Sequence, residues 1–158
     1  MEQVPGTRIY GFPSIGFPDH RVTFTFGVNY MNRPPRIMVV DDEMDICNFV
    51  KSFFETRGFS VTTALNGEEA MAKLDREKPD LILLDVIMRR GKEGLEYLPK
   101  IKAAMPSAKV IMVTGMEDND AVGEAKKLGA EDYITKPLVL EYLENTVLEK
   151  VRSLSAVA

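Results

Sequence analysis

From Arg36 onward, short apolar runs alternate with longer segments whose apolar residues recur at the helical period. Short apolar runs are typical of buried strands, and a period of about 3.6 residues is typical of helices that cover a sheet. The pattern predicts five strands, at 37–40, 60–63, 81–84, 109–113 and 132–134. It predicts five helices, at 42–57, 67–77, 93–104, 118–128 and 138–154.

Local signals support these helices. In the first helix, apolar residues spaced i, i+3, i+4 and i+7 predict one apolar face made by Ile46, Phe49, Val50 and Phe53. Gly58 ends this helix, and Asn66 is a suitable N-cap for the next. Pro99 predicts a kink, or a helix start, inside the third helix.

Strands that alternate with helices form parallel sheets, because parallel neighbours need a crossover connection. Right-handed crossovers favour a doubly wound sheet with helices on both faces. The fold class is therefore α/β, with a five-stranded parallel sheet and five helices. Ligands of such sheets bind beyond the carboxyl ends of the strands. The polar residues that fall at those ends are Asp41, Asp42, Asp85, Thr114 and Lys136.

Residues 1–35 differ in composition and form a predicted irregular N-terminal extension. Repeated Pro and Gly disfavour long helices there, although 22–28 is β-prone and suits an edge strand. Pro34-Pro35 marks the boundary with a domain at 36–154, and Met31 would make a natural start for that domain. The extension is either a functional segment or sequence upstream of the native start.

Composition narrows the classes of function. The formal net charge of −4 argues against direct nucleic-acid binding through a basic surface. Cys47 is the only cysteine, so no disulfide can form within the chain, which fits a cytoplasmic protein. No apolar stretch is long enough to span a membrane.

The acidic residues at two strand ends indicate a metal site. Asp41 and Asp42 follow one apolar strand, and Asp85 follows another. Two carboxylates about 4 Å apart repel each other by roughly 4 kcal/mol at an effective dielectric near 20. A hard divalent cation with oxygen ligands relieves this repulsion, which predicts a Mg²⁺ site around Asp85.

Residues 36–152 resemble the receiver domain of two-component response regulators. Four segments carry the resemblance, each at the carboxyl end of a predicted strand: 39–43 (VVDDE), 83–86 (LLDV), 113–115 (VTG) and 133–137 (YITKP). The resemblance implies a flavodoxin-like sheet with strand order 2-1-3-4-5. It also implies that the Lys136–Pro137 peptide is cis, and that the protein acts as a signalling switch.

The family assigns a role to each matching residue. Asp85 would be the nucleophile that accepts a phosphoryl group. The Mg²⁺ ligands would be Asp41, Asp42, Asp85 and the backbone carbonyl of Ile87. Lys136 and Thr114 would contact phosphoryl oxygens. Tyr133 would rotate inward with Thr114 and reshape the surface formed by the fourth helix, fifth strand and fifth helix.

The chain departs from the family in the loop after Asp85. Arg89 replaces the usual proline, the loop is one residue longer before Gly94, and the basic residues there could attract an acidic donor surface. Ile87 and Met116 flank the expected path of the hydrolytic water, and both are apolar. We therefore expect a comparatively long-lived aspartyl phosphate.

These residues predict a single-domain response regulator. Its phosphodonor would be a sensor histidine kinase or a histidine phosphotransfer protein, and its output would go to a downstream protein target. Such a protein catalyses its own phosphorylation and dephosphorylation but is primarily a switch, so its status as an enzyme stays open. The alternatives are a receiver-like binding module that ignores phosphorylation, a receiver fragment of a larger regulator, and a flavin-binding or phosphatase enzyme. The acidic loop after the first strand argues against the flavin-binding protein. Asp41-Asp42-Glu43 does not match the Asp-x-Asp pattern of a phosphatase with an aspartate nucleophile.

Overall fold

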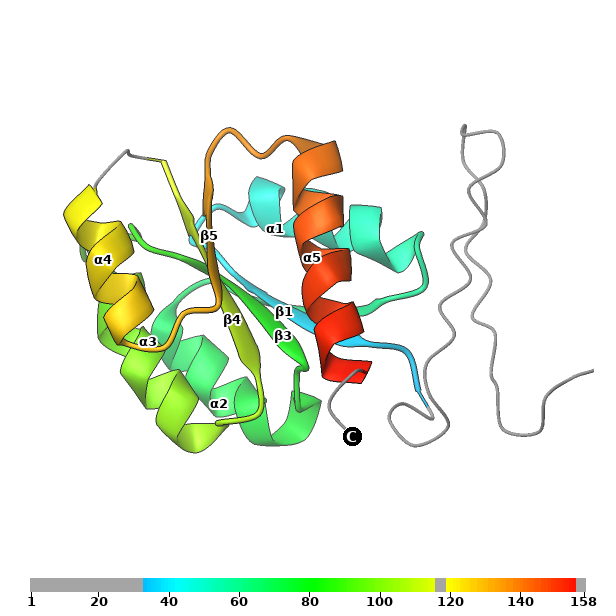
Figure 1. Ribbon diagram of the computed structural model, residues 1–158, viewed down its shortest axis with the longest axis horizontal. Coiled ribbons are helices and arrows are strands. Elements are labelled where there is room, and N and C mark those ends of the chain that lie inside the picture. Colours follow the sequence, from blue (N-terminus) through cyan, green and yellow to red (C-terminus); the bar gives the residue numbers. More distant parts are fainter. Residues whose placement is uncertain (1–32, 116–118, 156–158) are drawn as a thin grey trace, which may run out of the picture.

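A computed structural model describes residues 33–115 and 119–155 (Figure 1). It contains the predicted five strands and five helices in alternation. The strands are β1 (Arg36–Val40), β2 (Ser60–Ala64), β3 (Leu81–Asp85), β4 (Lys109–Thr114) and β5 (Asp132–Thr135). The helices are α1 (Met44–Glu55), α2 (Gly67–Glu77), α3 (Glu93–Ala104), α4 (Asn119–Lys127) and α5 (Leu140–Ser155).

All five strands are parallel, and their order in the sheet is β2-β1-β3-β4-β5, as predicted. β1 and β3 are neighbours, and Val40 pairs with Leu84. The residues that follow these two partners therefore lie side by side at the same sheet edge. The chain is consequently a doubly wound α/β domain of the flavodoxin-like type.

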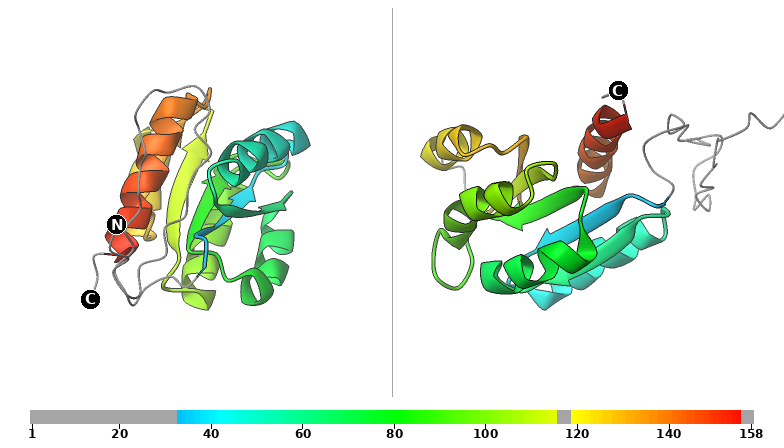
Figure 2. Two further views of the ribbon diagram at one scale, coloured as in Figure 1. Left: turned by 90° about the vertical axis from the view of Figure 1, so that its right-hand side faces the viewer. Right: turned by 90° about the horizontal axis from the view of Figure 1, so that it is seen from below.

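The sheet divides the apolar interior into two cores, because successive strand side chains point to opposite faces. Val39 and Leu83 pack with α1 and α5, whereas Val40 and Leu84 pack with α2, α3 and α4. Figure 1 shows α2, α3 and α4 together on one side of the sheet and α1 and α5 on the other, and Figure 2 turns the same layers by 90°. The central strand β3 is buried along its whole length.

Three local expectations from the sequence have different outcomes. Phe49 was expected on the buried face of α1, but 49 % of its surface is exposed. The fully buried positions are Cys47, Val50 and Phe54, and the predicted positions Ile46 and Phe53 are partly buried against the same core. Pro99 lies inside α3, which excludes a helix start there and leaves the predicted kink as the other alternative. The predicted cap of α2 is confirmed, because the Asn66 side chain accepts a hydrogen bond from the Glu69 N–H (2.7 Å).

The described chain begins with an anchored segment. The Arg33 guanidinium donates to both carboxylate oxygens of Asp80, at 2.8 and 3.1 Å. Asp80 also accepts the Arg36 N–H at 2.8 Å. The β-prone stretch at 22–28 lies outside the described residues. Within the described residues, no helix has the length and hydrophobicity that crossing a lipid bilayer requires.

Candidate functional site

Three aspartates meet at the carboxyl edge of the sheet. Asp41 follows β1, Asp42 is the next residue, and Asp85 is the last residue of β3. One oxygen of each carboxylate lies within 4.8 Å of one oxygen of each of the others. Asp41 and Asp85 are each only 3 % exposed, and Asp42 is half-buried. Because β1 and β3 are adjacent and in register, the sheet itself holds this cluster together.

Lys136 joins two of the three acids. Its Nζ donates to Asp41 Oδ2 at 2.8 Å and to Asp85 Oδ2 at 3.1 Å. Burial pulls the pKa of Lys136 down, but the hydrogen bond to Asp41 and the charges of Asp85 and Asp41 together raise it above its usual value. The ammonium group therefore keeps its charge. The Lys136–Pro137 peptide that follows is cis, as the family resemblance implied.

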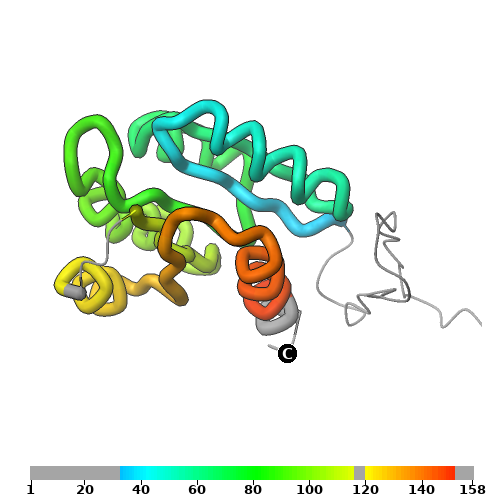
Figure 3. Tube along the Cα trace, turned by 90° about the horizontal axis from the view of Figure 1, so that it is seen from above, coloured from blue at the N-terminus to red at the C-terminus, as the bar shows by residue number. Residues whose placement is uncertain are grey.

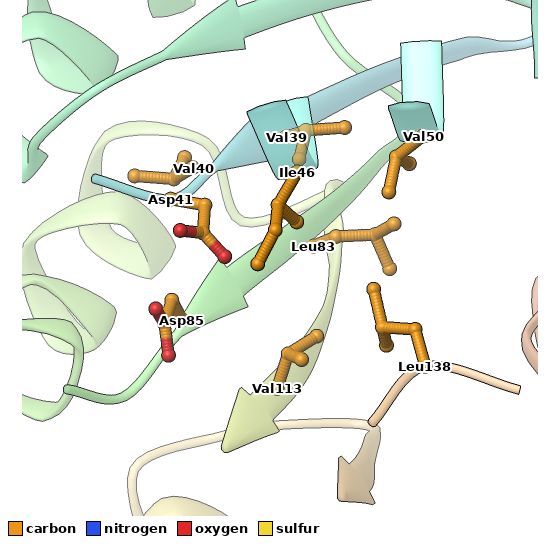
Figure 4. Close-up of a pocket in the computed structure, with 9 residues that line it drawn as sticks. All are labelled: Val39, Val40, Asp41, Ile46, Val50, Leu83, Asp85, Val113 and Leu138. Carbon is orange, nitrogen blue, oxygen red and sulfur yellow. The ribbon is translucent and has the colours of Figure 1, made fainter. Parts of the chain in front are cut away.

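Asp85 has an unfavourable environment for a carboxylate. Burial and the charge of Asp41 raise its pKa to about 6, although Lys136 and a hydrogen bond from the Ile87 N–H oppose this rise. Figure 4 shows the carboxylates of Asp41 and Asp85 at one side of a hollow whose other lining residues are apolar. The hollow is about 10 Å³, which is at the lower limit for one water molecule. With one ammonium group for three acids, the cluster lacks positive charge, and its oxygens suit a hard cation such as Mg²⁺.

Thr114 and Tyr133 occupy the neighbouring strands. Thr114 is the buried last residue of β4, and its carbonyl oxygen accepts the Lys136 N–H. Tyr133 lies in β5 and packs against the core that faces α2, α3 and α4. The hydroxyl oxygen of Tyr133 is buried and has no hydrogen-bond partner among the described residues. A buried polar group of this kind costs free energy in the conformation that contains it.

Ile87 and Met116 are the two residues expected beside the path of the hydrolytic water, and the structure describes the first of them. The Ile87 N–H donates to Asp85 Oδ1 at 3.3 Å, and 38 % of the Ile87 surface is exposed beside the acids. Met116 lies outside the described residues. Solvent therefore reaches the Ile87 side chain at the edge of the site.

The unusual loop between β3 and α3 closes as a tight turn. Met88 and Gly91 exchange two backbone hydrogen bonds of 2.9 and 3.0 Å, so that Arg89 and Arg90 form its tip. Gly91 has a φ of 81°, a conformation that L side chains rarely adopt. Figure 3 shows this loop in green, projecting from the molecule. The Gly94 N–H donates to the Val86 carbonyl oxygen at 3.0 Å, so the turn leaves the start of α3 against the end of β3.

Three residues that support the site were missed from the sequence. Cys47 is 1 % exposed, and its thiol donates to the Asp41 carbonyl oxygen at 3.3 Å. Burial, followed by the Asp41 charge, raises its pKa to about 11. Glu93 is buried, and its carboxylate accepts the N–H of Gly67 at the start of α2. Gly94 lies so close to Asp85 that a Cβ would overlap the Asp85 carbonyl oxygen. None of these contacts follows a period in the sequence.

Comparison with known proteins places this geometry in a family. A family model described as "Response regulator receiver domain" matches residues 37–148. The chain is 42 % identical to the chemotaxis protein CheY of Listeria monocytogenes over 114 residues, which cover 69 % of this chain and 95 % of that protein. It is 31 % identical to the sporulation initiation phosphotransferase F of Bacillus subtilis over 112 residues, which cover 71 % and 90 % of the two chains.

The fold agrees with these relatives. A CheY-like response regulator receiver domain protein from Methanospirillum hungatei superposes with a TM-score of 0.75 at 31 % identity. The match covers 79 % of this chain and 99 % of that structure. The family model covers more than half of the sequence, and the strand order and the acidic edge accompany it. The chain therefore belongs to the response regulator receiver domain family of two-component systems.

Proposed function

We propose that Asp85 accepts a phosphoryl group from a phosphohistidine of a sensor histidine kinase or a histidine phosphotransfer protein. A carboxylate oxygen of Asp85 forms the new P–O bond while the P–N bond of the donor breaks. The electron pair of that bond stays on the imidazole nitrogen, which then takes a proton from solvent. The observation that carries the proposal is the cluster of three acids within 4.8 Å, two of which bind Lys136.

The same acids fit a Mg²⁺ ion. Its ligands would be Asp41, Asp42, Asp85 and the backbone carbonyl of Ile87, all of which offer the oxygen atoms that Mg²⁺ prefers. When bound, the ion would offset the negative charge of the acids and of the incoming phosphoryl group. The lack of positive charge in the cluster supports this assignment, because Lys136 alone neutralises only one of three carboxylates.

Lys136 and Thr114 would hold the phosphoryl group after transfer. The Lys136 ammonium already lies 3.1 Å from Asp85 and remains charged, so it can donate to a phosphoryl oxygen there. Thr114 ends the strand next to Asp85, which puts its hydroxyl at the same edge of the sheet. Charge-assisted hydrogen bonds of this kind contribute about 1.5–3 kcal/mol each.

The resulting change would pass to the face formed by α4, β5 and α5, where a downstream protein target binds. Tyr133 lies in β5 of this face, and its buried hydroxyl has no partner among the described residues. The unsatisfied hydroxyl raises the free energy of this conformation of Tyr133. A small change at Thr114 can therefore shift the equilibrium toward another conformation of Tyr133. This supports Thr114 and Tyr133 as the two switch residues.

Recognition of the donor would involve α1 and the loops around Asp85. Among the exposed large apolar side chains, Met44 and Phe49 belong to α1 and Ile87 lies two residues after Asp85. Exposed apolar side chains near a site suit a surface that a partner covers. We assign this surface to the histidine-bearing donor and place the protein in the cytoplasm with that donor.

The proposal predicts a covalent modification at one residue. Incubation with acetyl phosphate and Mg²⁺ should add the mass of one phosphoryl group to the full chain, as read by intact-mass spectrometry. Asp85→Asn should gain nothing, because the nucleophile is lost, and EDTA should prevent the gain in the wild type. Asp75→Asn removes an exposed carboxylate from α2 and is the matched control, which should behave as wild type. Failure of the wild type to gain mass would favour the phosphorylation-independent binding module.

A further inference from the structure

The two arginines of the turn between β3 and α3 lie beside the phosphorylation site. A groove of about 280 Å³ runs between this turn and the loop that precedes α2. Arg89 and Arg90 line one side of the groove, and Glu68 lines the other. Asp42 belongs both to this lining and to the acid cluster. The groove therefore opens directly next to the place where the donor must lie.

The side chains of Arg89 and Arg90 are exposed, and neither forms a hydrogen bond or an ion pair with a described residue. The other arginines with described side chains differ in this respect. Each of these donates to an oxygen of the protein, and they are Arg33, Arg36, Arg57 and Arg76. Two adjacent guanidinium groups without partners, fixed at the tip of a closed turn, are available to a bound anion.

The net charge of the acid cluster determines how strongly it attracts an anionic donor. Asp41, Asp42 and Asp85 contribute three negative charges, and Lys136 contributes one positive charge. A divalent cation would bring the total to zero, so the site itself exerts little net attraction on an anionic donor. The acids that line the groove, Asp42, Glu68 and Glu93, repel an anion, so any attraction there depends on the two arginines. Arg89 and Arg90 are the cations that line this side of the site.

We propose that, among small phosphodonors, Arg89 and Arg90 favour those whose leaving group departs as an anion. This inference rests on the proposed phosphorylation of Asp85. For an acyl phosphate, the Asp85 oxygen forms a bond to phosphorus, the acyl O–P bond breaks, and its electron pair leaves on the carboxylate. For a phosphoramidate, the leaving nitrogen takes a proton and departs neutral. Guanidinium groups in the groove stabilise the first product and have little effect on the second.

The test compares two small donors on the full chain with Mg²⁺. The initial rate of mass gain is measured with acetyl phosphate and with phosphoramidate, for the wild type and for the double variant Arg89→Ala/Arg90→Ala. The acetyl phosphate rate should fall by about three- to tenfold, and the phosphoramidate rate should change by less than about twofold. The acetyl phosphate advantage should also shrink as salt rises, because the arginines are exposed.

Three further variants separate local charge from other effects. Arg89→Lys/Arg90→Lys keeps the charges and should restore most of the acetyl phosphate rate. Glu68→Gln removes the opposing charge and should raise that rate. Arg76→Ala removes one positive charge at the far end of α2, where Arg76 pairs with Glu77, and should leave both rates unchanged.

The outcomes distinguish this inference from the proposed function. Equal rates for the wild type and the Arg89→Ala/Arg90→Ala variant with both donors would overturn the inference while leaving phosphorylation of Asp85 intact. An equal loss with both donors would also overturn it, because leaving-group charge would then not matter. Absence of any mass gain in the wild type would overturn the proposed function, and this inference with it.

Discussion

At the scale of single residues, Gly94 supports Asp85 through the backbone. Its N–H donates to the Val86 carbonyl, and the Asp85 carbonyl oxygen occupies the space that a side chain would need. Gly94→Ala must therefore push the start of α3 away from the end of β3. We expect a loss of about 3 kcal/mol in the free energy of unfolding, measured by urea denaturation followed by circular dichroism.

A second glycine is the matched control for this substitution. Gly123 is exposed in the middle of α4, and a Cβ there would meet no atom within 4 Å. Gly123→Ala should raise the stability by about 0.5–1 kcal/mol, because alanine is the better helix former. If both variants changed the stability in the same direction, the close approach at Gly94 would not be the cause.

At the scale of secondary-structure elements, Glu69 links the start of α2 to the end of β2. Its carboxylate accepts from Lys73 Nζ at 2.7 Å and from the Leu65 N–H at 3.0 Å. The hydrogen bond from Lys73, followed by that from Leu65, lowers the pKa of Glu69 below its usual value. A lowered pKa in the folded state stabilises the fold above the pKa of the unfolded chain, and this contribution is lost as the pH falls through the folded value.

The pH dependence of a Glu69→Gln variant measures this contribution. The wild type should be more stable than the variant by about 0.5 kcal/mol near neutral pH, a small value because about a third of the side chain is exposed. Urea denaturation should show the difference closing as the pH approaches about 4 and below. A difference that grew with acidification would contradict the assigned direction of the shift.

The sequence predicts elements better than it predicts the contacts between them. The apolar runs and Asn66 locate the strands and the cap of α2, because these signals are local. Phe49 was misplaced because helical spacing fits two adjacent faces of α1, and only packing against the sheet chooses the face with Cys47 and Phe54. The contact of Glu93 with Gly67 joins residues 26 positions apart, so no local pattern reveals it.

At the scale of the whole molecule, the acid cluster weakens the fold when no cation is present. The three carboxylates repel one another, and the charge of Asp41 helps to raise the pKa of Asp85. Mg²⁺ at about one hundred times its dissociation constant should stabilise the domain by about 2.7 kcal/mol, which raises Tm by several degrees. Differential scanning calorimetry with and without the ion measures the shift.

Asp42→Asn tests the same cluster by removing a negative charge instead of adding a cation. It removes one half-buried charge, so Tm in EDTA should rise, by the equivalent of about 1 kcal/mol. The response of Tm to Mg²⁺ should fall sharply, because a ligand is lost. A lower Tm in EDTA together with an unchanged Mg²⁺ response would show that Asp42 is a structural residue.

The sheet divides the interior into two cores, and this division affects how the sequence of the domain can change during evolution. Side chains such as Val39 and Val40 are adjacent in the chain but belong to separate cores. Substitutions more than about 7–10 Å apart that share no neighbours have nearly additive effects on stability. A lineage can therefore remodel the interior beneath α2, α3 and α4 without compensating changes beneath α1 and α5, so the two halves can drift independently.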